Sequence, residues 1–219
     1  ETIEWIDSFE KDEKIIFWDI VANIGLYSIY AALKHKQINV FAFEASAINL
    51  GILTRNISIN SLSELIIVNQ FPLTDKENEY LMMRENSFEE GGSQNSFGEK
   101  FNFEGKNFLG KNNYKVYGTT INYLLKNNIL EIPNYIKIDV DGIEHLILRG
   151  AKNFLNDKRI KSMSIEINEN FKEQHNEVLM LMKNAGFVLK HKKQATMFAK
   201  SETFSKIFNH VFEKNIISS

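Results

Sequence analysis

The chain has 219 residues, of which 43% are hydrophobic and 25% are charged, the composition of a soluble folded domain. Its formal net charge of −2 argues against a nucleic-acid-binding protein, and no apolar run reaches the roughly 20 residues that cross a bilayer. Cysteine is absent, which excludes disulfides and thiol catalysis. Together with the lack of a signal-peptide pattern, this absence favours a cytoplasmic location.

Apolar runs and amphipathic segments alternate along most of the chain, which is typical of an α/β protein. The apolar runs predict strands over 14–20, 39–44, 65–71, 79–84 (an edge element), 114–118, 135–138, 162–168, 187–192 and 207–213. The amphipathic segments predict helices over 1–10, 25–36, 46–60, 119–130, 142–155 and 171–184. Ser46, and either Thr119 or Thr120, are suited to cap the helices that follow them. We expect one domain over residues 1–219, with a mostly parallel sheet and helices on both faces.

Residues 86–113 interrupt this alternation, because their hydrophobic residues follow neither a strand period nor a helix period. The segment is rich in glycine, asparagine and serine, and it also contains Phe97, Phe101, Phe103 and Phe108. A long irregular loop in a compact domain is usually a functional lid or disordered. The aromatic residues favour a lid that packs on something.

The turn between the first strand and the first helix, Asp19 to Gly25, has the character of a ligand-binding turn. Its small residues let the backbone approach a ligand at the N-terminus of a helix. Glu44 ends the second strand, 19 residues after Gly25 (44 − 25), and an acid at this spacing commonly binds ribose hydroxyls. Gly25 is the only glycine of the turn, which favours an adenosine cofactor without a phosphate over a dinucleotide. Alternatively, Asp19 only caps the turn and Glu44 is an ordinary strand-end acid.

The strand end at Asp139 carries the densest group of proton-transfer and metal-binding residue types. Asp139, Asp141, Glu144 and His145 follow the apolar run 135–138 within seven residues (145 − 138). The carboxyl ends of strands are where open α/β sheets bind their ligands. Asp139, Asp141 and His145 are therefore the catalytic candidates. The alternatives are that Glu144 caps a helix, that Asp141 belongs to a turn and that His145 is a packing residue.

A second strand end completes a candidate metal site. Glu166 and Asn168 end the run 162–168, so that Asp139 and Glu166 are expected to face the same crevice. Carboxylate and amide oxygens suit magnesium, and an added imidazole from His145 shifts the preference toward manganese or iron(II). The metal-ligand candidates are Asp139, Glu166 and His145.

Several motifs resemble, in their order along residues 15–212, the FkbM family of S-adenosylmethionine-dependent methyltransferases. They are DIVANIGLYS (19–28), VFAFEAS (40–46), NLGILTRNISIN (49–60), NSFG (95–98), IKIDVDGIEHLILRGA (136–151), SIEIN (164–168) and NHVF (209–212). The resemblance implies a class I (Rossmann-like) methyltransferase fold. Such a fold has a seven-stranded, mostly parallel sheet whose last strand is antiparallel, here with a long lid loop at about 86–113.

The resemblance also implies which residues bind the cofactor. Asp19, Val21, Ala22, Asn23 and Gly25 line its methionine and ribose part, Glu44 binds the ribose hydroxyls, and Phe71 flanks the adenine. Val21 departs from the family pattern, which usually has glycine at this position. A β-branched residue there weakens cofactor binding or displaces the cofactor, and in the extreme case the chain is a non-catalytic relative.

The function expected from the resemblance is methylation of a hydroxyl on a sugar, either nucleotide-linked or polysaccharide-related. In one version a divalent ion (Mg, Mn or Fe) held by Asp139 and Glu166 activates the hydroxyl; in another, Asp139, Asp141 or His145 acts as the base. Possible acceptor contacts with alternative structural roles are Tyr114, Tyr117 and Lys137.

Other functions fit the sequence less well. An NAD(P)-type oxidoreductase is disfavoured by the missing phosphate-binding glycines, and a nucleic-acid acceptor by the slightly negative charge. A homodimer is compatible with the sequence but not required by it.

Overall fold

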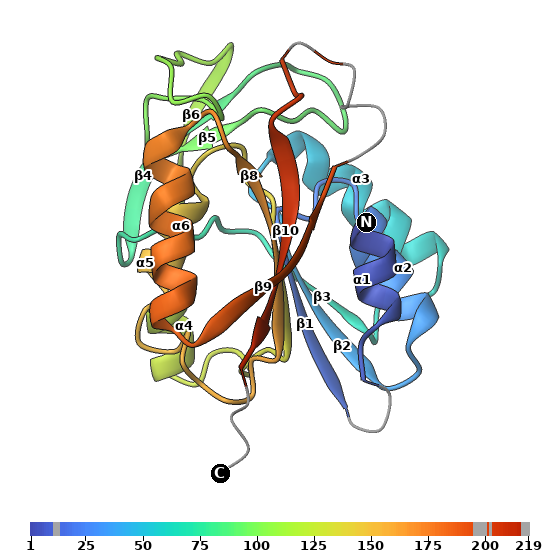
Figure 1. Cartoon of the computed structure of the whole chain (residues 1–219). Helices are drawn as coiled ribbons and strands as arrows, with labels where there is room; N and C mark the ends of the chain where they lie inside the picture. Colours follow the sequence, from blue (N-terminus) through green and yellow to red (C-terminus); the bar gives the residue numbers. More distant parts are fainter. Residues whose placement is uncertain (11–13, 195–200, 202, 216–219) are drawn as a thin grey trace.

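The main sheet is the seven-stranded, mostly parallel sheet that the resemblance implies (Figure 1). The structure is a computed structural model that describes residues 1–10, 14–194, 201 and 203–215. Seven strands form the sheet in the order β3-β2-β1-β7-β8-β10-β9, and β10 runs antiparallel to both of its neighbours. Their bounds are β1 (Ile15–Ile20), β2 (Ile38–Phe43), β3 (Ile66–Asn69), β7 (Tyr135–Ile138), β8 (Ser162–Asn168), β9 (Phe187–Lys193) and β10 (Ile207–Lys214). The predicted α/β class and its antiparallel last strand are confirmed; most of the polar connection before β10 lies outside the described residues.

Helices cover both faces of the sheet, with α1–α3 on one face and α4–α6 on the other (Figure 1). The bounds are α1 (Thr2–Asp7), α2 (Leu26–Lys34), α3 (Ala47–Ile59), α4 (Ile121–Lys126), α5 (Glu144–Arg149) and α6 (Lys172–Asn184). The Ser46 hydroxyl accepts the Asn49 N–H at 3.3 Å and caps α3, and the Thr120 hydroxyl caps α4 in the same way. Helix α5 ends at Arg149, earlier than the predicted 142–155. The next residue, Gly150, passes so close to Thr74 that a Cβ there would lie 2.1 Å from the Thr74 carbonyl oxygen.

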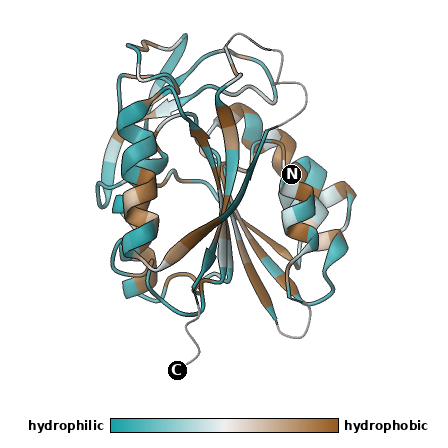
Figure 2. Ribbon diagram, in the orientation of Figure 1, coloured by the Kyte–Doolittle hydropathy of each residue, from teal (hydrophilic) through white to brown (hydrophobic). Residues whose placement is uncertain are grey.

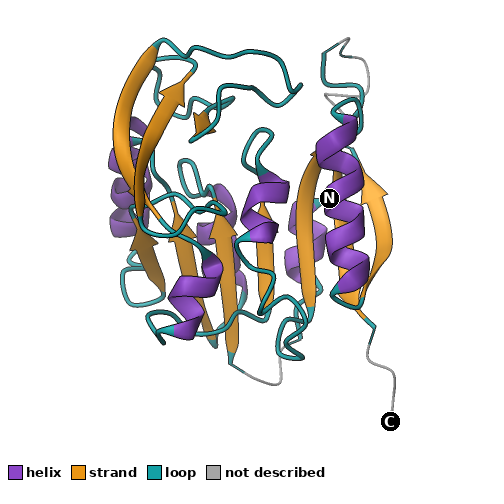
Figure 3. Cartoon of the chain, turned by 90° about the vertical axis from the view of Figure 1, so that its left-hand side faces the viewer, coloured by secondary structure: helices purple, strands orange, loops and turns teal. Residues whose placement is uncertain are grey.

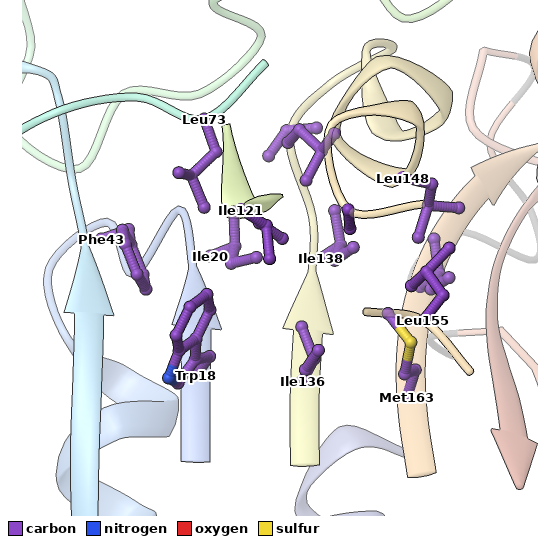
Figure 4. Close-up of a cluster of buried hydrophobic side chains, with 14 of the residues drawn as sticks. Trp18, Ile20, Phe43, Leu73, Ile121, Ile136, Ile138, Leu148, Leu155 and Met163 are labelled. Atoms are coloured by element: carbon purple, nitrogen blue, oxygen red, sulfur yellow. The ribbon is translucent and has the colours of Figure 1, made fainter. Parts of the chain in front are cut away.

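Two apolar layers enclose the sheet, since alternate residues of each strand point to opposite faces. Along β1, Trp18 and Ile20 pack under α4 and α5, whereas Phe17 packs toward α1 and α2. Figure 4 shows the first of these layers, in which Trp18, Ile136 and Met163 lie in a row across three strands. Hydrophobic residues concentrate in the strands, and the hydrophilic ones on the outer surfaces of the helices (Figure 2).

A separate three-stranded antiparallel sheet stands at one end of the main sheet (Figure 3). It consists of β4 (Glu79–Glu85), β5 (Ser96–Phe97) and β6 (Asn112–Gly118), in the order β5-β4-β6. The expectation that 79–84 forms an edge element of the main sheet is therefore wrong, because β4 pairs with β6 along its whole length. The loop 86–113 contributes β5 and a further bridge between Phe101 and Asn107. Within the described part of the chain, no helix is long and apolar enough to cross a membrane.

A buried ion pair joins the two central strands of the main sheet. Asp19 on β1 lies beside Lys137 on β7 in the strand register, and both side chains are buried. The Lys137 Nζ atom is 3.5 Å from the Asp19 carboxylate and 3.2 Å from that of Asp139. Burial lowers the pKa of Lys137, but the two carboxylates outweigh that effect and raise it, so the side chain stays charged.

We predict that Lys137→Met destabilises the protein by about 3–5 kcal/mol, because it leaves the buried Asp19 carboxylate without a cation. Adding Asp19→Asn to this variant should restore part of the loss. Urea denaturation measures the free energies of unfolding, and Lys14→Met, which removes an exposed ion pair with Glu131, is the matched control. A Lys137→Met protein as stable as the control variant would contradict the prediction.

Candidate active site

A cavity of about 600 Å³ opens at the carboxyl ends of β1, β2, β7 and β8. This volume is within the range of roughly 300–1,000 Å³ that is usual for small-molecule sites. Its walls come from the turn after β1, the end of β2, the segment at Phe71, the loop 91–97 and the ends of β7 and β8. The cavity therefore lies where the sequence predicts the ligand crevice, and it brings both predicted halves of the site together.

The turn after β1 has an unusual backbone. Val21, Asn23 and Gly25 have φ angles of +60°, +52° and +92°, all in the left-handed region. The position of Val21 explains why a glycine is common there, since a β-branched residue in this region carries a cost of about 1–2 kcal/mol. Val21, Ala22 and Asn23 line the cavity. Asp19 and Gly25 lie behind that wall, where Asp19 is fully buried and Gly25 caps α2.

Glu44 is held rigidly at the end of β2. Its carboxylate accepts the backbone N–H groups of Asn23 and Ser46, each at 2.8 Å, and it forms part of the cavity wall. Burial raises the pKa of Glu44 to about 7. Phe71 also lines the cavity and packs against Phe43, with ring centroids 5.9 Å apart. A fixed carboxylate and an aromatic wall in one cavity fit the ribose and the adenine of an adenosine cofactor.

Asp139 and Glu166 meet because their strands are neighbours in register. Ile138 on β7 pairs with Ile165 on β8, so that the next residues of the two strands are side by side. The two carboxyl groups are therefore neighbours, and both line the cavity. Burial, with the adjacent charge of Asp139, raises the pKa of Glu166 well above its usual value, which favours the protonated form of Glu166. The Lys137 ammonium lies on the other side of Asp139, at 3.2 Å.

The turn that follows Asp139 contains two further acids, the partly buried Asp141 and the buried Glu144. Asp141 has a φ of +58° and Gly142 one of +121°; a Cβ at Gly142 would lie 2.9 Å from the Asn102 carbonyl oxygen. The Glu144 carboxylate accepts the N–H groups of Val140 and Gly142 and a hydrogen bond from Gln174. Burial raises the pKa of Asp141 to about 7 and that of Glu144 to about 8.

Side chains at the cavity rim hold the loop 86–113 over the opening. Asp141 accepts the N–H groups of Gln94 and Asn95, at 2.6 Å and 3.3 Å. Asn23 and Asn49 hydrogen-bond to the backbone at Gly91 and Gly92, and Asn168 donates to the Phe103 carbonyl oxygen at 3.0 Å. The loop is thus bound by three residues that the sequence analysis singles out: Asn23 of the turn after β1, Asp141 and Asn168.

His145 lies outside the cavity wall. Its ring is buried between Phe101 and Phe171, with centroid separations of 6.4 Å and 6.1 Å, and burial lowers its pKa. Among the described residues, the one group of three metal-ligand side chains close enough to share an ion is Glu169, His175 and His210. Asp139, Glu166 and His145 do not form such a group, so the residues present do not fit the predicted three-ligand metal site.

Some contacts at the site have no clear signal in the sequence. Gln174 reaches Glu144 from α6, and Asn49 reaches the loop from α3, through pairings set only by the tertiary fold. Tyr114 donates to Glu85 at 3.0 Å and Tyr117 packs on Tyr80, so both belong to the small sheet and not to the cavity wall. Phe204 completes the wall opposite the turn after β1.

We predict that Val21→Gly tightens the binding of S-adenosylhomocysteine, because it removes a side chain from the cavity wall and relieves the left-handed strain. Val21→Ala keeps a Cβ at the same backbone angle and should give a smaller gain. The free energy of unfolding should change by less than about 1 kcal/mol. The relief of backbone strain in the folded state offsets the larger conformational entropy that glycine loses on folding. Isothermal titration gives the affinities; weaker binding by the glycine variant would be the opposite result.

We predict that the affinity for S-adenosylhomocysteine rises with pH up to about 7 and then levels off. This expectation follows if the ionised Glu44 carboxylate accepts the two ribose hydroxyls, because the protonated form, favoured below its pKa of about 7, would not accept both. Glu44→Gln should bind more weakly and lose much of this pH dependence. The exposed Glu64→Gln is the control. An unchanged pH profile in the Glu44 variant would contradict the assignment.

Comparison with known proteins identifies the family. The methyltransferase FkbM domain matches residues 19–189. Two similar solved structures are an rRNA methylase from Streptococcus thermophilus (TM-score 0.56, 14% identity, 97% of this chain and 93% of that one) and a precorrin-6y C5,15-methyltransferase from Geobacter metallireducens (TM-score 0.55, 11% identity, 97% and 85%). TrmK of M. capricolum, in complex with S-adenosylhomocysteine, aligns with a TM-score of 0.53 at 12% identity over 97% of this chain and 67% of that one.

These identities show a shared fold and nothing finer. A comparison with curated proteins finds no significant match. The domain match covers most of the chain and agrees with the class I methyltransferase sheet described above. The chain therefore belongs to the FkbM methyltransferase family and is an S-adenosylmethionine-dependent methyltransferase.

Proposed function

We propose that the protein methylates a hydroxyl group of a sugar, nucleotide-linked or polysaccharide-related, with Asp139 as the general base. The observation that carries the proposal is the Asp139–Glu166 pair in the cavity wall, with the Lys137 ammonium 3.2 Å from Asp139. A hydroxyl is a weak nucleophile, so its methylation needs a group that takes its proton. This pair is suited to that task.

The protein's own contribution is to orient the acceptor and to remove one proton. Bound S-adenosylmethionine supplies an electrophilic methyl group and a neutral thioether leaving group. The acceptor hydroxyl would lose its proton to the Asp139 carboxylate as it took the methyl group. The raised pKa of Glu166 favours its protonated form, which would donate to Asp139 and leave Asp139 as the proton acceptor of the pair. The products would be a methyl ether and S-adenosylhomocysteine.

The wall around the pair supports an acceptor with several hydroxyls. Phe103 and Phe204 stack with ring centroids 5.6 Å apart and both line the cavity, so that an aromatic face lies in the same chamber as the two carboxyl groups. Gln94 and Asn95 add amide groups from the loop. Aromatic faces together with carboxylates and amides suit the alternating apolar and hydroxyl faces of a sugar ring.

The arrangement of side chains around Asp139 favours a mechanism in which a base acts without a metal ion. In the metal-assisted version a divalent ion binds Asp139 and Glu166, with or without His145. His145 packs between Phe101 and Phe171 outside the cavity wall and adds no third ligand there. The Lys137 ammonium already provides the positive charge beside Asp139. We therefore propose that catalysis does not require a divalent ion at this pair.

A nucleic-acid acceptor has less support. Two of the structural neighbours are RNA-modifying enzymes by name, but at 12–14% identity they share the fold alone. The net charge of −2 gives this chain no general attraction for a phosphate backbone. We propose a small carbohydrate acceptor instead.

Methyl transfer from radiolabelled S-adenosylmethionine to a panel of nucleotide sugars and oligosaccharides tests the proposal, with bulk tRNA and rRNA as the competing acceptors. We expect label in a carbohydrate, and equal rates before and after exhaustive treatment with EDTA. Label in RNA would overturn the acceptor class. Loss of activity with EDTA, restored by Mg²⁺ or Mn²⁺, would overturn the metal-free version.

We predict that Asp139→Asn lowers kcat by about 10²–10⁴-fold, which is the usual contribution of a general base. Asp141→Asn should keep most of the activity, because an amide oxygen still accepts the N–H groups of Gln94 and Asn95, and asparagine tolerates a φ of +58°. Steady-state kinetics and S-adenosylhomocysteine affinity are measured for both variants. Equal losses of kcat would show that the two acids do not differ in role.

A further inference from the structure

A second group of potential ligands converges away from the cavity, where β8, α6 and β10 meet. Glu169 follows β8, His175 belongs to the first turn of α6 and His210 lies on β10. One ligand atom from each of the three lies within 4.8 Å of the others, and His210 Nε2 is 3.6 Å from the Glu169 carboxylate. Two imidazoles with one carboxylate form a ligand set that zinc and similar transition-metal ions accept, with water in the fourth position.

The His210 ring is oriented as a metal ligand requires. Its Nδ1 atom is 3.1 Å from the Phe208 carbonyl oxygen, to which it donates as the N–H tautomer, and this leaves the Nε2 lone pair facing Glu169. A hydrogen bond from the second ring nitrogen to a backbone carbonyl is the usual support of a metal-bound histidine.

Lys192 opposes a metal here by direct contact. Its Nζ atom is 2.6 Å from the Glu169 carboxylate, and Lys172 adds a further positive charge near His175. Lys192 also lies over the Phe208 ring, 4.4 Å from its centroid, and its side chain is 42% exposed. It can therefore leave the carboxylate and keep its contact with the ring and with water.

We propose that Glu169, His175 and His210 bind one zinc-class transition-metal ion, and that Lys192 competes with it for the Glu169 carboxylate. The ion would tie together three elements behind the cavity wall. The Glu169 N–H donates to the Lys206 carbonyl oxygen at 2.9 Å, and the adjoining residues Phe204 and Ile207 line the cavity. The site is thus a brace for the acceptor side of the cavity, separate from the Asp139–Glu166 pair.

Cobalt(II) titration of the full chain, stripped beforehand with a chelator, tests the proposal. We expect visible-region absorption from one tetrahedral Co²⁺ per chain, its displacement by Zn²⁺, and a higher melting temperature with Zn²⁺. His175→Ala should abolish these signals; His175 is only partly buried, so this variant is expected to fold. His191→Ala, on the neighbouring β9, is the matched control and should bind Co²⁺ like the wild type. A wild type without Co²⁺ absorption, or an unaffected His175→Ala, would overturn the proposal.

The competition has its own test in a pair of lysine variants. Lys192→Gln removes the cation from Glu169 and should tighten Co²⁺ binding by about tenfold. Lys190→Gln removes a neighbouring lysine that pairs with Glu213 and should leave the affinity unchanged. Equal affinities for the two variants would overturn the role of Lys192.

Discussion

The buried ammonium of Lys137 is the interaction on which the rest of the site depends. It lies between Asp19 on β1 and Asp139 at the end of β7, in a sheet whose buried side chains are mostly apolar. Around the same strand ends, Glu44 and Glu144 are buried and Asp141 and Glu166 are partly buried, and ionising several carboxyls so close together is costly. The positive charge of Lys137 stabilises the carboxylates beside it, and one of them, Asp139, lines the cavity.

The loop 86–113 explains why the strand ends are so polar. It contains little regular structure, and its backbone N–H and C=O groups therefore need partners from elsewhere. Asp141 accepts two of its N–H groups, and Asn23, Asn49 and Asn168 bind other parts of its backbone. The polar side chains at the carboxyl edge thus divide into those that bind the loop, such as Asp141 and Asn168, and those that line the cavity without binding the loop, such as Asp139 and Glu166.

Much of the fold was predictable from the sequence, because strands such as 162–168 and helices such as 171–184 are strongly patterned and well bounded. The strand 79–84 was misassigned, since local pattern does not reveal that it pairs with 112–118 across an irregular loop. At the site, the juxtaposition of Asp139 and Glu166 follows from parallel register alone. The different roles of the residues do not follow from the sequence. Asp141 and His145 have side chains as suited to proton transfer as that of Asp139, but the tertiary fold directs Asp141 toward the loop and His145 between two phenylalanine rings.

The turn after β1 and the buried acids together show how the free protein is suited to bind a cofactor. Val21 holds a strained left-handed backbone, and Glu44 is buried with a pKa of about 7. In the unfolded chain that carboxyl loses its proton near 4.5, so ionisation destabilises the folded state as the pH rises from there to about 7. If Glu44 accepts the ribose hydroxyls of the cofactor, as we predict, they would stabilise its ionised form and reverse this effect. Part of the binding free energy would then come from relieving an unfavourable state that the fold imposes, so that a ligand without a ribose diol should lose more affinity than its missing hydrogen bonds alone account for.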